Sequence, residues 1–128
     1  MWIAIIILLL AAKAEARASC EPLSGIFKKV EGPSKLTGDF NFTSTHFNMS
    51  LAYNGTTYSL GDISYKTKSQ EISARLCWVH IPNDVINRIP KTVIDHVGLP
   101  RLYWSEGELM LPVRFGSNRS IDTAYFKK

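Results

Sequence analysis

The sequence lacks the residue patterns that most enzymes and metalloproteins require. Its 128 residues include only three histidines, His46, His80 and His96, and none of them stands in an H-x-x-x-H or C-x-x-C setting. A metal site is therefore unsupported. Glycine-rich phosphate-binding loops and the G-x-S-x-G motif of serine hydrolases are also missing. We predict a protein without catalysis and without a cofactor.

Two pairs of neighbouring residues have side chains of the kind that enzymes use in catalysis. Glu106 and Glu108 flank Gly107, and paired carboxylates can hydrolyse glycosidic bonds. At the tip of a hairpin, however, such residues are usually solvated parts of the turn. Asp95 and His96 are adjacent on a predicted helical turn, where neighbours point about 100° apart and do not form a dyad.

Clustered positive charge is missing as well. The net charge is +4, but the lysines and arginines are scattered along the chain. A nucleic-acid-binding protein would gather them on one element. We interpret the charge as a solvated surface and predict no nucleic-acid partner.

The chain has no apolar run long enough to cross a membrane. Residues 2–12 form an apolar run of 11 residues, whereas a spanning helix needs about 20. The run fits the core of a signal peptide, and Ala16-Arg17-Ala18 fits a cleavage site. We predict a signal peptide over residues 1–18 and a single β-rich secreted domain over residues 19–128, with no stable membrane span after processing. An uncleaved anchor is the alternative.

Cysteine is scarce but even in number. Cys20 and Cys77 are the two cysteines of the chain, and in an oxidising compartment we expect them to form one disulfide. The bridge would tie the start of the mature chain to a core strand. Two free thiols are the alternative.

Four of the six asparagines stand in N-x-[ST] sequons, the acceptor motif of N-linked glycans: Asn41, Asn48, Asn54 and Asn118. We predict that all four are exposed. This excess favours a eukaryotic or viral secretory glycoprotein, located outside the cell. A bacterial periplasmic protein is the alternative.

Alternating apolar and polar residues predict strands over most of the mature chain. The alternation is clearest over residues 40–53, followed by Asn54-Gly55, a strong hairpin pattern. The return strand is predicted over residues 57–65, with a bulge or kink at Gly61-Asp62. Further strands are predicted over residues 25–30, 71–81, 101–105, 109–115 and 121–126. In the strand 71–81 we place Trp78 on the core side and Cys77 with Val79 on the other. Pro112 suggests an edge strand, because proline cannot donate to a sheet.

Pro82-Asn83-Asp84 interrupts the strand pattern. Asn83 or Asp84 could cap a short helix through Ile89, and a second turn could follow over residues 92–97. The predicted fold is mainly β, a small antiparallel barrel or sandwich of six to seven strands with one short helical insertion at about residues 83–97.

Arg101, Tyr103 and Trp104 are the candidates for binding a partner, because Arg, Tyr and Trp carry a large share of interface energy. The simpler interpretation, which we favour, is that Leu102 and Trp104 face the core while Arg101 and Tyr103 face solvent.

The function expected from these patterns is binding. We predict a small secreted or extracytoplasmic binding or inhibitory protein that acts on another protein. The second hypothesis is a carrier of a small apolar ligand inside a β-barrel. If the host is bacterial, the prediction becomes a periplasmic immunity or inhibitor protein. A small secreted hydrolase is the least expected function. A carrier should have an apolar cavity of a few hundred Å³, and a protein binder an exposed apolar patch. An enzyme should have a cleft that holds His80 or His96 beside a carboxylate.

Overall fold

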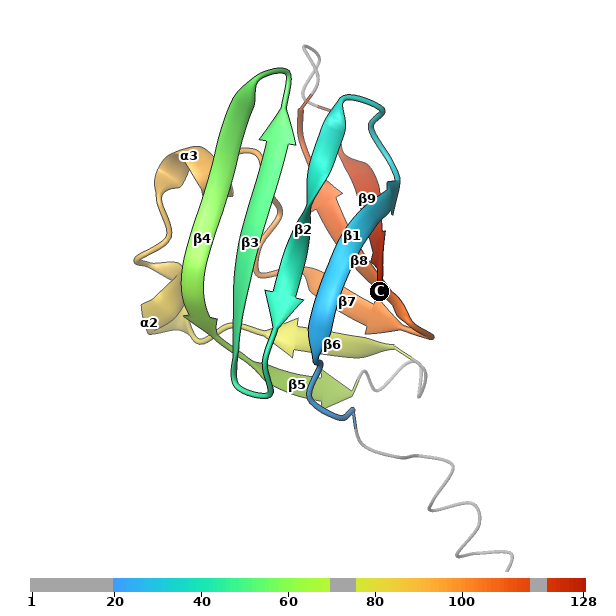
Figure 1. The fold of residues 1–128 in the computed structure, drawn as a ribbon. Coiled ribbons are helices and arrows are strands. Elements are labelled where there is room, and N and C mark those ends of the chain that lie inside the picture. Colours follow the sequence, from blue (N-terminus) through green and yellow to red (C-terminus); the bar gives the residue numbers. More distant parts are fainter. Residues whose placement is uncertain (1–19, 70–75, 116–119) are drawn as a thin grey trace, which may run out of the picture.

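The protein folds into a nearly closed antiparallel barrel with two short helices at its side (Figure 1). The computed structural model describes residues 20–69, 76–115 and 120–128. The mainly β fold is confirmed, and the barrel is favoured over a sandwich. The predicted strand number is too low, since the described chain forms nine strands. One added strand is Lys66–Ser69, whose polar sequence carries no hydrophobic alternation.

The nine strands run in one sheet in the order β4-β3-β2-β1-β9-β8-β7-β6-β5. Their bounds are β1 Gly25–Glu31, β2 Leu36–Phe42, β3 His46–Tyr53, β4 Thr56–Ser64, β5 Lys66–Ser69, β6 Cys77–His80, β7 Leu102–Ser105, β8 Glu108–Val113 and β9 Asp122–Lys127. Pairing of β1 with β9 joins the first strand of the barrel to the last. The strands β4 and β5 end the order, yet they are consecutive in the chain and meet at Tyr65.

Tyr65 holds the corner between β4 and β5. Its hydroxyl accepts a hydrogen bond from Leu23 N at 3.0 Å and donates to the Thr43 carbonyl oxygen at 2.6 Å. Burial raises the pKa of this phenol, and the bond to the Leu23 backbone opposes that rise. The corner therefore ties the N-terminal segment and the β2–β3 turn to the bend of the sheet.

Phenylalanine rings fill the barrel. Phe40 lies 4.9 Å from Phe126 and 5.8 Å from Phe47, measured between ring centroids. Phe27 packs edge-to-face on Phe42 at 5.6 Å and on Trp104 at 5.3 Å. Such offset and edge-to-face contacts are the favoured geometries of aromatic pairs. These rings belong to the buried core in the interior of the barrel.

Two hairpins close with the turn that the strand twist prefers. Asn54 and Gly55 have φ angles of 51° and 86°, and Glu106 and Gly107 have 50° and 86°. Two consecutive left-handed residues define a type I′ turn. The hairpin predicted at Asn54-Gly55 is confirmed.

The bulge predicted at Gly61-Asp62 is confirmed too. The register shifts between Phe47 and Met49, whose partners are Ile63 and Leu60. Asp62 takes a left-handed φ of 51° at this point.

The helical insertion consists of two single turns, α2 Asn83–Ile86 and α3 Lys91–Ile94, which lie beside β4 in Figure 1. The predicted cap at Asn83 or Asp84 is wrong. Pro82 and Pro90 precede the helices as N-caps, with no side-chain cap bond at either. Proline's fixed φ sets the chain for a helical start without a capping side chain.

Pro112 does not mark an edge strand, because β8 pairs with β7 on one side and β9 on the other. Its paired stretch with β7 ends at Met110, so Pro112 lies beyond the end of that neighbour. There its carbonyl oxygen accepts a hydrogen bond from Gly98 N at 2.7 Å. β7 begins only at Leu102, so it does not extend alongside Pro112, which has no N–H to donate to it.

The predicted orientation of residues 76–81 is reversed. Val79 and Ile81 are fully buried, while Trp78 is half-buried on the outer side of β6. Cys77 shares the inner side with Val79. The prediction failed because the largest apolar residue was assigned to the core. The first part of the predicted strand, residues 71–75, lies outside the described residues.

Candidate functional site

Four large apolar side chains form a continuous row across the outer surface of β6, β7, β8 and β9. Trp78 is paired in register with Tyr103, Tyr103 with Met110, and Met110 with Tyr125. Each has at least one buried neighbour in its strand, so all four point outward, and each is half-buried. Directly paired side chains in a sheet lie about 4.5–5.5 Å apart at Cβ. We call these four residues the apolar row.

Trp78 is held in place on this surface. Its indole Nε1 donates a hydrogen bond to the Pro100 carbonyl oxygen at 2.9 Å, and His80 packs edge-on against its ring at 4.8 Å between centroids. A fixed aromatic side chain loses little conformational entropy when a partner binds.

His80 is unusual among the described residues. Its Nδ1 is the single buried side-chain nitrogen or oxygen in that part of the chain with no hydrogen-bond partner. Burial lowers the pKa of His80, and the charges of Lys68 and Lys66 lower it further. The imidazole beside Trp78 is therefore held toward its neutral form.

Positive charges border one end of the apolar row. Lys68 is paired in register with Trp78, and Lys66 with His80. Arg101 is exposed and immediately precedes β7. At the other end Glu31 of β1 is paired in register with Tyr125, and Lys127 Nζ lies 3.4 Å from a carboxylate oxygen of Glu108. The surface thus combines an apolar centre with a cationic margin at its β5–β7 end.

The structure separates the three predicted partner-binding residues. Tyr103 lies in the apolar row and Arg101 is exposed beside β7. Trp104 points inward, where its ring meets Phe27. The interpretation that places Leu102 and Trp104 on the core side is therefore confirmed.

Sequence reasoning missed Trp78, Met110 and Tyr125 as parts of this surface. Their alternation with buried residues could have placed each of them on an outer face. The two-residue turn at Glu106-Gly107 fixes the pairing of Tyr103 with Met110, but the other two pairs join strands that no short turn connects, and no local pattern specifies their register.

The outer surface of β2, β3 and β4 has the opposite character. Its side chains are small and polar, in cross-strand sets such as Asp39, Ser50 and Ser59. Three sequon asparagines belong here and all are exposed, as predicted: Asn41, Asn48 and Asn54. Asn41 and Asn48 are direct cross-strand partners. We call this surface the polar face. Asn118 lies outside the described residues.

Asn48 also has a structural contact. Its side-chain oxygen Oδ1 accepts a hydrogen bond from Asp62 N at 2.8 Å. This bond satisfies the backbone donor that the bulge leaves unpaired. Attachment of a sugar to the side-chain nitrogen would leave the acceptor oxygen in place.

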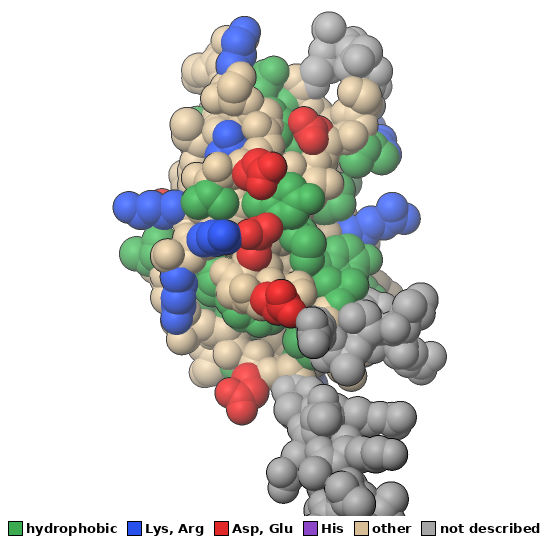
Figure 2. Space-filling model, turned by 90° about the vertical axis from the view of Figure 1, so that its right-hand side faces the viewer, with side chains coloured by type: hydrophobic (Ala, Val, Ile, Leu, Met, Phe, Trp, Pro, Cys, Tyr) green, Lys and Arg blue, Asp and Glu red, His purple; other side chains and the backbone are tan. Residues whose placement is uncertain are grey.

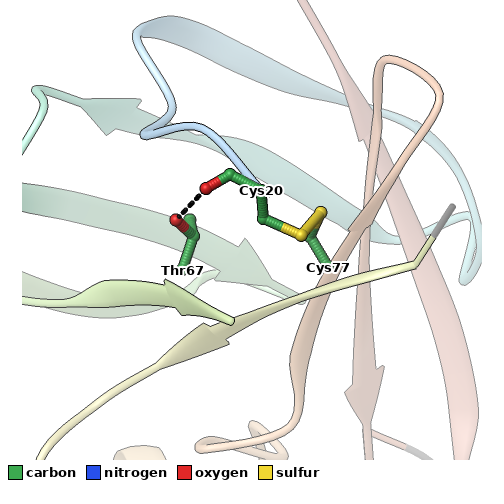
Figure 3. Close-up of a disulfide and its surroundings, with 3 residues drawn as sticks. All are labelled: Cys20, Thr67 and Cys77. Carbon is green, nitrogen blue, oxygen red and sulfur yellow. Dashed lines mark hydrogen bonds between the residues drawn. A yellow bond between two sulfur atoms is a disulfide. The ribbon is translucent and has the colours of Figure 1, made fainter. Parts of the chain in front are cut away.

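The predicted disulfide is confirmed. Cys20 and Cys77 are bridged with a Cα–Cα distance of 5.7 Å across a sequence separation of 57. Thr67 Oγ1 of β5 donates a hydrogen bond to the Cys20 carbonyl oxygen at 2.7 Å (Figure 3). The bridge fixes the segment before β1 to β6, and the hydrogen bond from Thr67 fixes it to β5. Because Cys77 faces inward, it lies on the core side of the sheet. A disulfide is compatible with an extracellular or periplasmic location.

The histidines and the glutamate of the β7–β8 hairpin have separate structural contacts. Glu108 is paired with Lys127, and His46 Nδ1 lies 2.8 Å from Thr45 Oγ1. His96 Nδ1 lies 3.0 Å from the Arg114 carbonyl oxygen, so the backbone, and not Asp95, orients this ring. Within the described residues, no three His, Cys, Asp or Glu side chains are grouped to hold a metal ion. No helix in that part of the chain has the length and apolar character to span a bilayer.

Comparison of the chain with protein-family models, with curated proteins and with solved structures finds no significant match.

Proposed function

We propose that this protein is a secreted glycoprotein that binds another protein through the outer surface of β6–β9. The observation that carries the proposal is the apolar row of Trp78, Tyr103, Met110 and Tyr125, aligned in register over four strands. Trp, Tyr, Met and Arg are the residues enriched at protein interfaces.

The disposition of the sequons supports the same proposal. The described sequons lie on the polar face or at its hairpin end, while the apolar row belongs to the other half of the sheet order. Glycans on Asn41, Asn48 and Asn54 would project from one half of the barrel. The surface proposed for the partner would remain uncovered by them.

The charge around the row suggests the chemistry of the partner. Lys66, Lys68 and Arg101 border the end at β5–β7. Opposite charge on the partner would steer association and fix its orientation. The partner surface should therefore combine apolar side chains with carboxylates.

A single substitution tests the proposal inside the secretory pathway. Tyr103→Asn completes an N-x-S sequon with Trp104 and Ser105, which would place a glycan in the middle of the apolar row. The protein is secreted from its host cells, captured with its bound partner from the native fluid, and compared with wild type. We expect the variant to lose the captured partner.

Matched variants separate the sugar from the side chain. Tyr103→Asn with Ser105→Ala changes the same tyrosine without a glycan and should retain more partner than the glycosylated variant. Ser59→Asn with Gly61→Ser adds a sequon on the polar face and should retain the partner fully. Equal capture by wild type and Tyr103→Asn, with the glycan confirmed by mass, would refute the proposed surface.

A further inference from the structure

A second candidate site lies at the mouth of the barrel, away from the apolar row. A groove of about 730 Å³ is bounded by the ends of β3 and β4, by α3 and by the segment that follows β8. Small-molecule sites typically occupy about 300–1,000 Å³, and barrel mouths are among their preferred locations.

Aromatic rings form the floor of this groove. Phe115 stacks on Tyr53 at 4.7 Å and on His96 at 5.4 Å, with interplanar angles of 19° and 4°. Tyr58 leans on both Phe115 and His96. Phe115 is buried and the other three rings are half-buried. The floor therefore presents flat apolar surface together with two phenol groups.

The orientation of His96 specifies what it can bind. Because a carbonyl oxygen only accepts, His96 Nδ1 donates its hydrogen to Arg114. In the neutral imidazole, Nε2 then carries the lone pair and needs a donor. Within the described chain the hydroxyls of Tyr53 and Tyr58 have no hydrogen-bond partner. A ligand hydroxyl can satisfy these groups.

The rim of the groove carries a net positive charge. Lys91 of α3 and Arg114 are cations, and Asp95 is an anion. All three side chains are exposed. Together these three side chains carry a charge of +1, which is complementary to a ligand with a single negative charge. Arginine and lysine are the usual partners of carboxylates.

We propose that this groove binds a small aromatic carboxylate with a ring hydroxyl. The ring would lie on the floor of Tyr53, Tyr58 and Phe115, the carboxylate would meet Arg114 and Lys91, and the hydroxyl would donate to His96 Nε2. The proposal does not depend on the protein-binding surface, since the two sites share no residue.

The test uses the full-length secreted protein and 4-hydroxyphenylacetate as the probe. Amide chemical shifts are followed by two-dimensional NMR during titration. We expect saturable shifts at His96, Phe115 and the β3–β4 hairpin, with a Kd of roughly 0.1–1 mM, since few contacts offset the loss of ligand freedom. The neutral amide of the same probe should bind about tenfold more weakly or worse, a difference of about 1.4 kcal/mol.

Variants locate the charge recognition. Arg114→Gln should weaken binding of the carboxylate about tenfold while leaving the amide analogue nearly unchanged. Arg88→Gln removes an exposed arginine of the same charge that pairs with Asp84 outside the groove, and it should bind as wild type does. If Arg114→Gln fails to fold, as judged by its spectrum, Lys91→Gln takes its place.

Two outcomes would overturn the proposal. One is the absence of saturable shifts up to about 10 mM probe, well above the expected Kd. The other is equal binding of the carboxylate and its amide, because charge at the rim would then play no part.

Discussion

The two halves of the barrel have similar interiors and different exteriors. Inward residues of β2–β4, such as Phe40, Met49 and Leu60, are as apolar and as buried as Val79, Leu102 and Leu111 of β6–β8. Outward residues differ: the polar face carries Asn, Ser, Thr and Asp, whereas β6–β9 carry the apolar row.

The comparison of the two exteriors shows which surface features the fold needs and which it does not need. A sheet needs only one apolar face to form a core, and the polar face meets that requirement. An aligned outer row of Trp, Tyr, Met and Tyr is not needed to form a core, and it leaves apolar surface in contact with water. The row is therefore the feature that needs an explanation outside folding, and binding supplies one.

The surface between the halves is mixed. Figure 2 views the molecule from the side of β1 and β9 and shows hydrophobic side chains among acidic and basic ones. Ile26 and Val30 of β1 are about half exposed, at 50% and 55%, with Lys28 between them. This junction has neither the sequons of the polar face nor the aligned rings of the apolar row.

The largest expected effect comes from crowding the backbone of the polar half. Gly38 has a φ of 140°, and a Cβ there would collide with the Ser50 carbonyl oxygen and Leu51 Cα of the paired strand. Gly38→Ala should lower the free energy of unfolding by more than about 4 kcal/mol, since neither backbone nor partner strand can move aside. Urea denaturation measures the change.

The control is Gly55→Ala, where nothing lies within 4 Å of the added carbon and strain of about 1–2 kcal/mol is expected. Equal losses in both variants would contradict this account.

Sequence alone predicted the polar half much better than the other half. In β3, strict alternation from Phe47 to Leu51 and the following Asn54-Gly55 turn specify strand, face and hairpin together. Strand β6 has only four residues, Cys77–His80, and the large apolar side chain of Trp78 is typical of a core residue. The apolar row depends on strands that are distant in sequence, such as β6 and β7, with two helices between them. Local patterns do not specify that register.

Removing the disulfide should weaken the connection between the halves. The bridge joins the segment before β1 to β6 across 57 residues. In the chain-entropy model such a loop stabilises the folded state by about 4 kcal/mol. Cys20→Ala with Cys77→Ala should therefore lower the free energy of unfolding by about that amount, measured by urea denaturation. Reduction of the wild-type protein with dithiothreitol should reproduce the loss. A loss below about 1 kcal/mol would indicate that the reduced chain is already constrained when unfolded.

A smaller effect is expected at the corner where one half passes into the other. Tyr65→Phe removes the hydroxyl that bonds Leu23 N and the Thr43 carbonyl oxygen. One buried and one partly buried backbone group lose their partner, which should cost about 1–3 kcal/mol. The control is Tyr125→Phe on the apolar row, whose hydroxyl has no hydrogen bond to any described residue, and where a change within about 0.5 kcal/mol is expected. Thermal unfolding of both variants gives the comparison. If Tyr125→Phe were the more destabilising, the hydrogen bonds of Tyr65 would not be what stabilises the corner.

The smallest effect is a pH dependence that belongs to the apolar half. The folded protein holds the pKa of His80 below its usual 6.5, through burial first and then through Lys68 and Lys66. Below pH 6.5 the unfolded chain takes up a proton that the folded chain resists, so the stabilisation present above that pH is lost as pH falls toward the lowered pKa. The melting temperature of wild type should therefore fall more steeply between about pH 7.5 and 5 than that of His80→Gln, by a small margin because the ring is partly exposed. Lys66→Gln with Lys68→Gln should reduce the margin without abolishing it, since burial is the larger cause. If the melting temperatures of wild type and His80→Gln changed equally with pH across this range, the pKa of His80 would be the same in the folded and the unfolded chain.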